Sequence, residues 1–144
     1  MATQIFVNLP VKDLFRSVEF FTKLGYRFNQ QFTDENATCM IVGENIYVML
    51  LVEPFFQTLT KKEIVDATKS TEAIICLSAD SREQVDEMIS KAVNAGGTIT
   101  REPEDHGYMY GHGYQDLDGH LWEVMYMDPS TVMPEQPVAE ASIR

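Results

Sequence analysis

The amino-acid sequence predicts an α+β domain made of two βαβββ modules. The main observation behind this prediction is a pair of amphipathic helices, each preceded by a short strand of alternating polarity. Three further strand-like runs follow each helix, so the same order of elements occurs twice within 144 residues. The two modules have little sequence identity with each other, and the repeat is therefore one of pattern. A chain of this length suffices for a single domain with its own apolar core.

The helices are predicted from their caps and from their apolar spacing. The first begins after Asp13, a favourable N-cap residue, and ends at Gly25. The second begins after Ser81, where Gln84 three positions later completes a capping box, and it ends at the two glycines of residues 96–97. Apolar side chains recur at helical spacing at Leu14, Val18, Phe21 and Leu24, and again at Val85, Met88, Ile89, Ala92 and Val93.

Period-two alternation between turn residues predicts the strands. They lie at residues 4–9, 26–32, 37–42 and 46–51 in the first module, and at residues 72–78, 98–101, 108–115 and 120–125 in the second. The modules then cover about residues 3–52 and 71–128 of a single domain over residues 1–128, with a connector at residues 53–70.

Two further segments are predicted outside the modules. In the connector, Thr60 and Glu63 form another capping-box pattern, which predicts a short helix over residues 61–67. At the end of the sequence, residues 129–144 hold three prolines and show no periodicity. This composition predicts an extended or disordered tail.

The composition excludes several classes of function. Eleven Lys and Arg against 22 Asp and Glu give a net charge of −11, which repels phosphate backbones and anionic membranes, so neither nucleic acid nor a membrane is an expected partner. No apolar run approaches the roughly 20 residues that span a bilayer, and the first residues lack a signal-peptide pattern. Cys39 and Cys76 form no C-x-x-C pair and are interpreted as reduced core thiols. We expect a cytoplasmic protein.

Four segments of the sequence resemble one known superfamily. They read NLPVKDL at residues 8–14, FFTKLGY at 20–26, AGG at 95–97 and DLDGHLWE at 116–123. Together with the doubled βαβββ order, they make residues 4–127 similar to the glyoxalase/bleomycin-resistance/extradiol-dioxygenase (vicinal oxygen chelate, VOC) superfamily. The last segment departs from the usual D-P-D-G-x-x-x-E motif at Leu117, which replaces the proline. The resemblance implies a U-shaped cavity in a mixed sheet, a divalent metal ion in that cavity, and a homodimer.

The resemblance places the metal ligands on the first and fourth strands of each module. Carried over to this sequence, those positions are Phe6, Met49, Ile74 and Glu123. The family uses His, Glu or Gln because the site needs nitrogen or oxygen donors, and only Glu123 is of that kind. We therefore expect no cofactor, and these positions do not support a Zn, Ni, Mn, Fe or Co ion.

Strand alternation predicts what lines the cavity instead. If the apolar face of each strand packs under the helices, the opposite face points into the cavity. The ligand-binding residues so predicted are Phe6, Asn8, Tyr47, Met49, Ile74, Cys76, Leu121, Glu123 and Met125. This lining is mainly apolar and aromatic, as small-molecule sites usually are.

Glu123 is the candidate catalytic residue. Among apolar neighbours its carboxylate loses solvation, which raises the pKa of a carboxyl group and suits a general acid or base. The alternative interpretation is a carboxylate at the wet mouth of the cavity with no role.

His112 is a candidate partner of Glu123, depending on the turn that precedes the last strand. A plain four-residue loop at residues 116–119 would place the two side chains opposite each other. Gly119 favours a type I turn with a G1 bulge, which shifts the side-chain parity by one residue and turns His112 away from the cavity. Met109, Gly111 and Gly113 then face the cavity.

Three functions are compatible with these observations. The first is a protein that binds a small apolar or aromatic molecule in a cavity without the usual metal ligands. The second is a metal-dependent lyase, isomerase or dioxygenase similar to lactoylglutathione lyase, with atypical ligands such as Glu123, His112 and Asn8. The third is a metal-free enzyme with Glu123 as general base. The resemblance implies a homodimer, for which we expect two equivalent sites. Phe15 and Phe20 lie off the main apolar helix face and are candidates for the partner surface.

Overall fold

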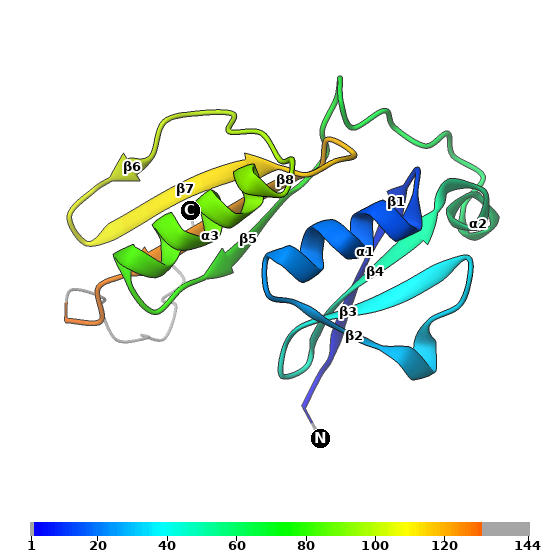
Figure 1. Ribbon diagram of the computed structural model, residues 1–144, viewed down its shortest axis with the longest axis horizontal. Helices are drawn as coiled ribbons and strands as arrows, with labels where there is room; N and C mark the ends of the chain where they lie inside the picture. The colour runs from blue at the N-terminus through cyan, green and yellow to red at the C-terminus, as the bar shows by residue number, and fades with distance from the viewer. Residues whose placement is uncertain (1, 131–144) are drawn as a thin grey trace, which may run out of the picture.

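The computed structural model describes residues 2–130 and contains two four-stranded sheets (Figure 1). The first module has β1 (Ile5–Val11), α1 (Leu14–Lys23), β2 (Arg27–Asn29), β3 (Ala37–Gly43) and β4 (Ile46–Val52). The second has β5 (Ile74–Ser78), α3 (Arg82–Asn94), β6 (Glu104–Asp105), β7 (Met109–Gln115) and β8 (Leu121–Met127). The strand orders are β1-β4-β3-β2 and β5-β8-β7-β6. The first and last strands of each module pair in parallel and the other neighbours are antiparallel, which confirms the predicted α+β fold of two βαβββ modules.

Both predicted helix starts are confirmed. The Asp13 carboxylate accepts a hydrogen bond from the Arg16 backbone N–H at 3.1 Å, and the Ser81 hydroxyl oxygen accepts one from the Gln84 N–H at 3.0 Å. Each cap satisfies an amide that has no partner within its own helix. Gly25, with a φ of +103°, follows the end of α1 as predicted.

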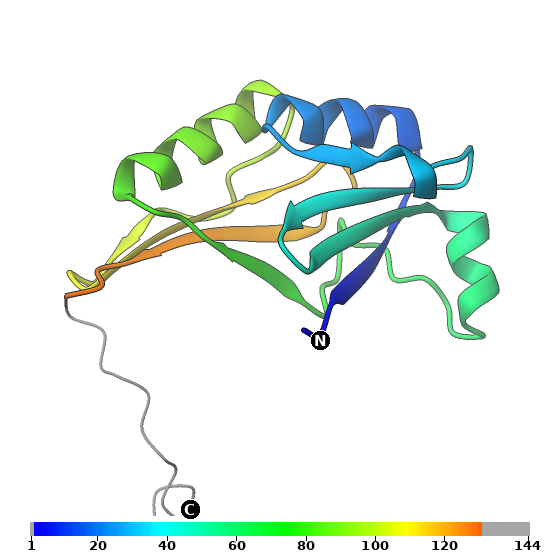
Figure 2. The ribbon, with the colours of Figure 1, turned by 90° about the horizontal axis from the view of Figure 1, so that it is seen from below.

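The two long helices lie on the same side of the sheets (Figure 2). They cover one face of each sheet, and we call the opposite face the free face. The core under the helices includes Val48 and Leu50 from β4 and Trp122 and Val124 from β8. These are strand positions that alternation places under the helices, so the predicted division of the strands into two faces is confirmed.

The helix α1 packs against both modules. Its Phe21 ring lies 5.2 Å from the Trp122 ring, and its Phe20 ring lies 6.2 Å from the Tyr114 ring, measured between centroids. Phe20 is therefore buried, and the prediction that it serves a partner surface is wrong. A helix held between two modules buries more than one stripe of side chains. Phe15 is 76% exposed and remains open to a partner.

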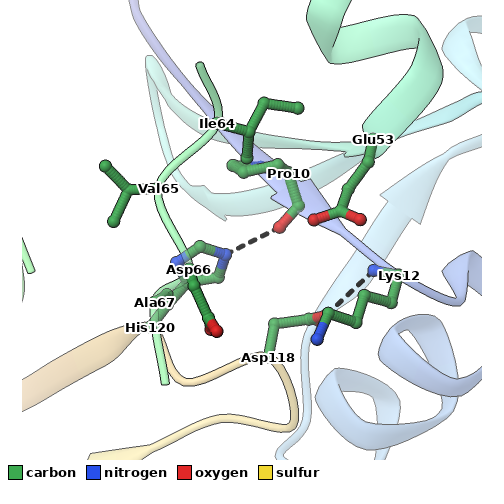
Figure 3. Close-up of a pocket in the computed structure, with 9 residues that line it drawn as sticks. All are labelled: Pro10, Lys12, Glu53, Ile64, Val65, Asp66, Ala67, Asp118 and His120. Carbon is green, nitrogen blue, oxygen red and sulfur yellow. Dashed lines mark hydrogen bonds between the residues drawn. The ribbon is translucent and has the colours of Figure 1, made fainter. Parts of the chain in front are cut away.

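The turn between β7 and β8 fastens the second module to the end of β1 (Figure 3). The Asp118 carboxylate accepts hydrogen bonds from the Lys12 backbone N–H at 2.9 Å and from the Ser17 hydroxyl at 3.3 Å. The His120 Nε2–H donates to the Pro10 carbonyl oxygen at 2.7 Å. These hydrogen bonds hold the two modules in one fixed arrangement.

The connector differs from its prediction. Its helical residues are α2 (Glu53–Phe56) and the 3-10 turn η2 (Gln57–Leu59), and residues 61–67 form no helix. The Thr60 hydroxyl oxygen accepts a hydrogen bond from the Lys62 N–H at 3.1 Å. This bond closes a turn of two residues, so the Thr60 side chain is used locally and does not cap a helix.

Two of the predicted strands are shorter than expected. In place of a strand at residues 98–101, Thr98 forms an isolated bridge with Gln115, and β6 is the edge strand of that sheet. In the first module, β2 ends at Asn29, whose side-chain oxygen accepts from the Gln31 N–H at 3.0 Å and begins the 3-10 turn η1 (Gln30–Phe32). Side chains that bond to nearby amides compete with strand pairing in this way.

Two expectations concern parts of the chain beyond the sheets. The predicted tail at residues 129–144 lies outside the described residues, apart from its first two. Within residues 2–130, none of the helices has the length and apolar character that crossing a membrane requires.

Candidate functional site

The free face of the first sheet carries four of the nine predicted ligand-binding residues. The strand register pairs Phe6 with Tyr47 and Asn8 with Met49 across β1 and β4. The Phe6 and Tyr47 rings stack, with centroids 4.8 Å apart and planes 15° apart. Phe6 is 47% exposed, so the stacked pair is open to a ligand or a partner. We call these four residues the β1/β4 patch.

The free face of the second sheet carries the other five residues, which we call the β5/β8 patch. The register pairs Ile74 with Leu121 and Cys76 with Glu123, and Met125 lies two positions farther along β8. Ile74 is 54% exposed. Within residues 2–130 no strand pair joins the two sheets, so the predicted cavity lining is divided between two separate faces.

The turn before β8 has the bulge that the sequence favours. Gly119 has a φ of +95°, and the register pairs Gly113 with Glu123 and His112 with Val124. Because paired residues share a face, Gly113 lies beside Glu123 on the free face, whereas His112 lies on the helix side. The prediction that His112 faces away from Glu123 is confirmed.

Arg101 is the site residue that sequence reasoning missed. Its guanidinium forms an ion pair with the Glu123 carboxylate and a second one with Glu104 at 2.9 Å. The His112 Nε2–H donates to the Arg101 carbonyl oxygen at 3.0 Å, which holds the backbone at this position. Glu123 is therefore a paired, partly buried carboxylate and not the isolated one that the sequence analysis assumed.

Cys76 lies beside this ion pair. Partial desolvation is the main effect that raises the pKa of the Cys76 thiol; the negative charge of Glu123 adds to the rise, and Arg101 opposes it. The side chain is thus a neutral thiol, which suits contact with an apolar group better than nucleophilic attack. The prediction of a core thiol is confirmed for Cys39 and wrong for Cys76, which is exposed on the free face.

The donor set does not fit the metal ion that the family fold implies. Three of the four carried-over positions are Phe6, Met49 and Ile74, which offer no nitrogen or oxygen donor. The fourth, Glu123, already has the Arg101 guanidinium as its counterion. Across the part of the chain that the structure describes, no three His, Cys, Asp or Glu side chains gather as ligands. These side chains therefore give no support to the metal chemistry of the family.

Two hollows lie away from the patches. A cavity of about 190 Å³ lies where the end of β1, the connector and the β7–β8 turn meet, and Figure 3 shows the Glu53 and Asp66 carboxylates beside it. A groove of about 330 Å³ lies beside α3. None of the nine predicted residues lines either hollow.

Comparison with known proteins identifies the family. Residues 4–124 match the model of the Glyoxalase/Bleomycin resistance protein/Dioxygenase superfamily, and the chain belongs to this superfamily. The matched residues include the first module with all of the β1/β4 patch, and the second module as far as Val124 in β8. A search of curated proteins found no match.

Solved structures agree on the fold. A hypothetical protein from S. aureus is 28% identical, with a TM-score of 0.75, over 88% of this chain and 94% of that chain. A glyoxalase/bleomycin resistance protein/dioxygenase family enzyme from Burkholderia phytofirmans PsJN is 16% identical, with a TM-score of 0.74, over 88% and 99%. The fosfomycin resistance protein FosX from Listeria monocytogenes is 17% identical, with a TM-score of 0.64, over 94% and 96%. The last two likenesses establish the fold alone.

Proposed function

We propose that this protein binds a small, mainly apolar or aromatic molecule without the help of a metal ion. The observation that best supports this function is the stacked, half-exposed Phe6–Tyr47 pair on the β1/β4 patch. Aromatic rings in such a position bind flat apolar surfaces by stacking and by burial of area. Asn8 and the Arg101–Glu123 pair supply the few polar contacts that orient a ligand in a site of this composition.

We also propose that a second copy of the chain completes the site. The β1/β4 and β5/β8 patches lie on separate sheets, and each presents exposed apolar side chains. In a twofold dimer, the β1/β4 patch of one protomer faces the β5/β8 patch of its partner. This arrangement buries both patches and creates two equivalent cavities.

The dimer proposal predicts the mass in solution. Light scattering at micromolar concentration should give about twice the chain mass of 16.4 kDa. Ile74→Asp places a charge within the proposed interface and should convert most of the protein to monomer, because an unpaired buried charge is strongly unfavourable. Val65→Asp makes the same kind of change at an exposed position of the connector and should leave the dimer intact. A monomeric wild-type protein would contradict the proposal.

The two enzymatic alternatives have weaker support. The metal-dependent one needs Glu123, His112 and Asn8 as joint ligands, but His112 lies on the helix side of β7 and Glu123 on the free face. The metal-free one needs Glu123 as an available base, and its ion pair with Arg101 favours a role in orienting a ligand instead.

Removal of the Phe6 ring should weaken ligand binding. With 1-methoxynaphthalene, an aromatic probe without a hydrogen-bond donor, Phe6→Ala should raise Kd about tenfold, because a stacked ring contributes about 1 kcal/mol beyond the apolar area it buries. Phe15→Ala removes the same ring from an exposed position on α1 and should leave Kd within about twofold. Isothermal titration calorimetry in buffer with EDTA measures both effects and tests the independence from metal. Equal Kd values for the two variants, or loss of binding in EDTA, would count against the proposed function.

A further inference from the structure

The groove beside α3 lies on the helix side of the second sheet, away from both patches. It is lined by Ile89 and Val93 from α3, by Ile99 from the loop that follows, and by His112 from β7. Val93 and Ile99 are exposed although they are apolar. Asp86, Ser90 and Asn94 of α3 also line the groove, so its exposed apolar wall lies beside several polar groups, of which His112 is the one from the sheet.

His112 is buried, and one of its ring nitrogens has no partner. The residue is only 8% exposed. Its Nε2 bonds to the Arg101 carbonyl oxygen at 3.0 Å, and since a carbonyl only accepts, a proton lies on Nε2; in the tautomer with its proton there, Nδ1 carries a lone pair. No donor among residues 2–130 meets Nδ1.

The unpartnered Nδ1 is reached from the groove. Within the described residues, every fully buried side-chain nitrogen or oxygen has a hydrogen-bond partner. Nδ1 has no such partner, so it must be one of the few atoms of His112 that remain accessible. Because His112 lines the groove, we infer that Nδ1 is accessible from the groove. An accessible acceptor atom on a residue that is only 8% exposed, opening into a groove with an apolar wall, is a feature that a ligand with a donor group satisfies.

We propose that this groove binds a small, uncharged, flat aromatic molecule that carries one hydrogen-bond donor, of the indole or phenol type. The donor bonds to Nδ1 of His112, and the ring packs against Ile89, Val93 and Ile99. The Asp86 carboxylate, which also lines the groove, disfavours anions. The volume of about 330 Å³ accommodates a molecule of one or two rings. This site is separate from the proposed cavity, because His112 and Glu123 lie on opposite faces of the sheet.

The test compares indole with N-methylindole, which has the same ring system and no N–H donor. Titration of indole into ¹⁵N-labelled protein should shift amide signals of α3 and Ile99 in a saturable manner. N-methylindole should bind about fivefold more weakly, as expected for the loss of one net hydrogen bond. His112→Phe keeps a ring at the base of the groove and should remove the difference between the two probes.

A second variant tests the groove without changing His112, whose side chain also bonds to the Arg101 carbonyl oxygen. Val93→Asp, at an exposed helix position, should weaken indole binding at least about tenfold, whereas Val65→Asp on the connector should not change it. Each of three results would overturn the proposal. These are equal affinities for the two probes, indole binding that persists in Val93→Asp, and shifts confined to the free face around Phe6 and Glu123.

Discussion

Replacing Asp116 with asparagine should lower the free energy of unfolding by about 3 kcal/mol. The buried Asp116 carboxylate accepts three hydrogen bonds, one on Oδ2 from the Trp122 Nε1–H at 2.9 Å and two on Oδ1 from the Asp118 and His120 backbone N–H groups at 2.9 and 3.0 Å. Asparagine has one side-chain oxygen, so in either orientation its NH2 group faces at least one N–H donor. The unsatisfied donor lies in the core, where it costs about 1–3 kcal/mol by itself.

The matched control for this prediction is Asp34→Asn. Asp34 accepts both of its hydrogen bonds on one oxygen, from the Asn36 N–H at 2.8 Å and the Ala37 N–H at 3.0 Å, and asparagine can reproduce them. This exposed variant should change stability by less than about 0.5 kcal/mol. Thermal unfolding followed by circular dichroism should give a Tm about 6–12 °C lower for Asp116→Asn. Similar Tm values for the two variants would show that the three hydrogen bonds do not stabilise the turn.

Replacing Gly119 with alanine should destabilise the protein by about 2–5 kcal/mol. Gly119 has a φ of +95°, which costs an L-residue with a Cβ about 1–2 kcal/mol. The added Cβ would also lie 2.7 Å from backbone atoms of Ala67 and Thr68 in the connector. Because backbone atoms cannot rotate away as a side chain can, the connector must move off the turn, and overpacking of this kind costs a further 1–3 kcal/mol, approximately.

The chain offers a control that separates these two effects. Gly25 has a φ of +103°, but no atom lies within 4 Å of an added Cβ. Gly25→Ala should therefore cost about 1–2 kcal/mol, the backbone contribution alone. Urea unfolding of both variants gives the difference, which measures the contact between the turn and the connector. If Gly119→Ala is no less stable than Gly25→Ala, the close packing at Gly119 does not contribute to stability.

The sequence by itself determined the features that depend on atoms a few residues apart. Asp13 and Ser81 start their helices because each side chain bonds to an amide three positions later. Alternation assigned the faces of the strands, and Gly119 placed His112 and Glu123 on opposite sides of the sheet. The capping pattern at Thr60 gave a wrong prediction, because a hydrogen bond from a nearby backbone N–H to the threonine hydroxyl also closes a short turn.

Only the tertiary structure decided which distant side chains meet. Arg101 reaches Glu123 because the chain leaves the sheet after Thr98 and returns as β6, a path that no local pattern specifies. Phe20 is buried because α1 lies between two modules, and His112 lines a groove because α3 and its following loop lie beside β7. Such contacts result from many weak packing interactions summed over the whole chain, whereas a cap or a turn is decided by one or two hydrogen bonds between near neighbours.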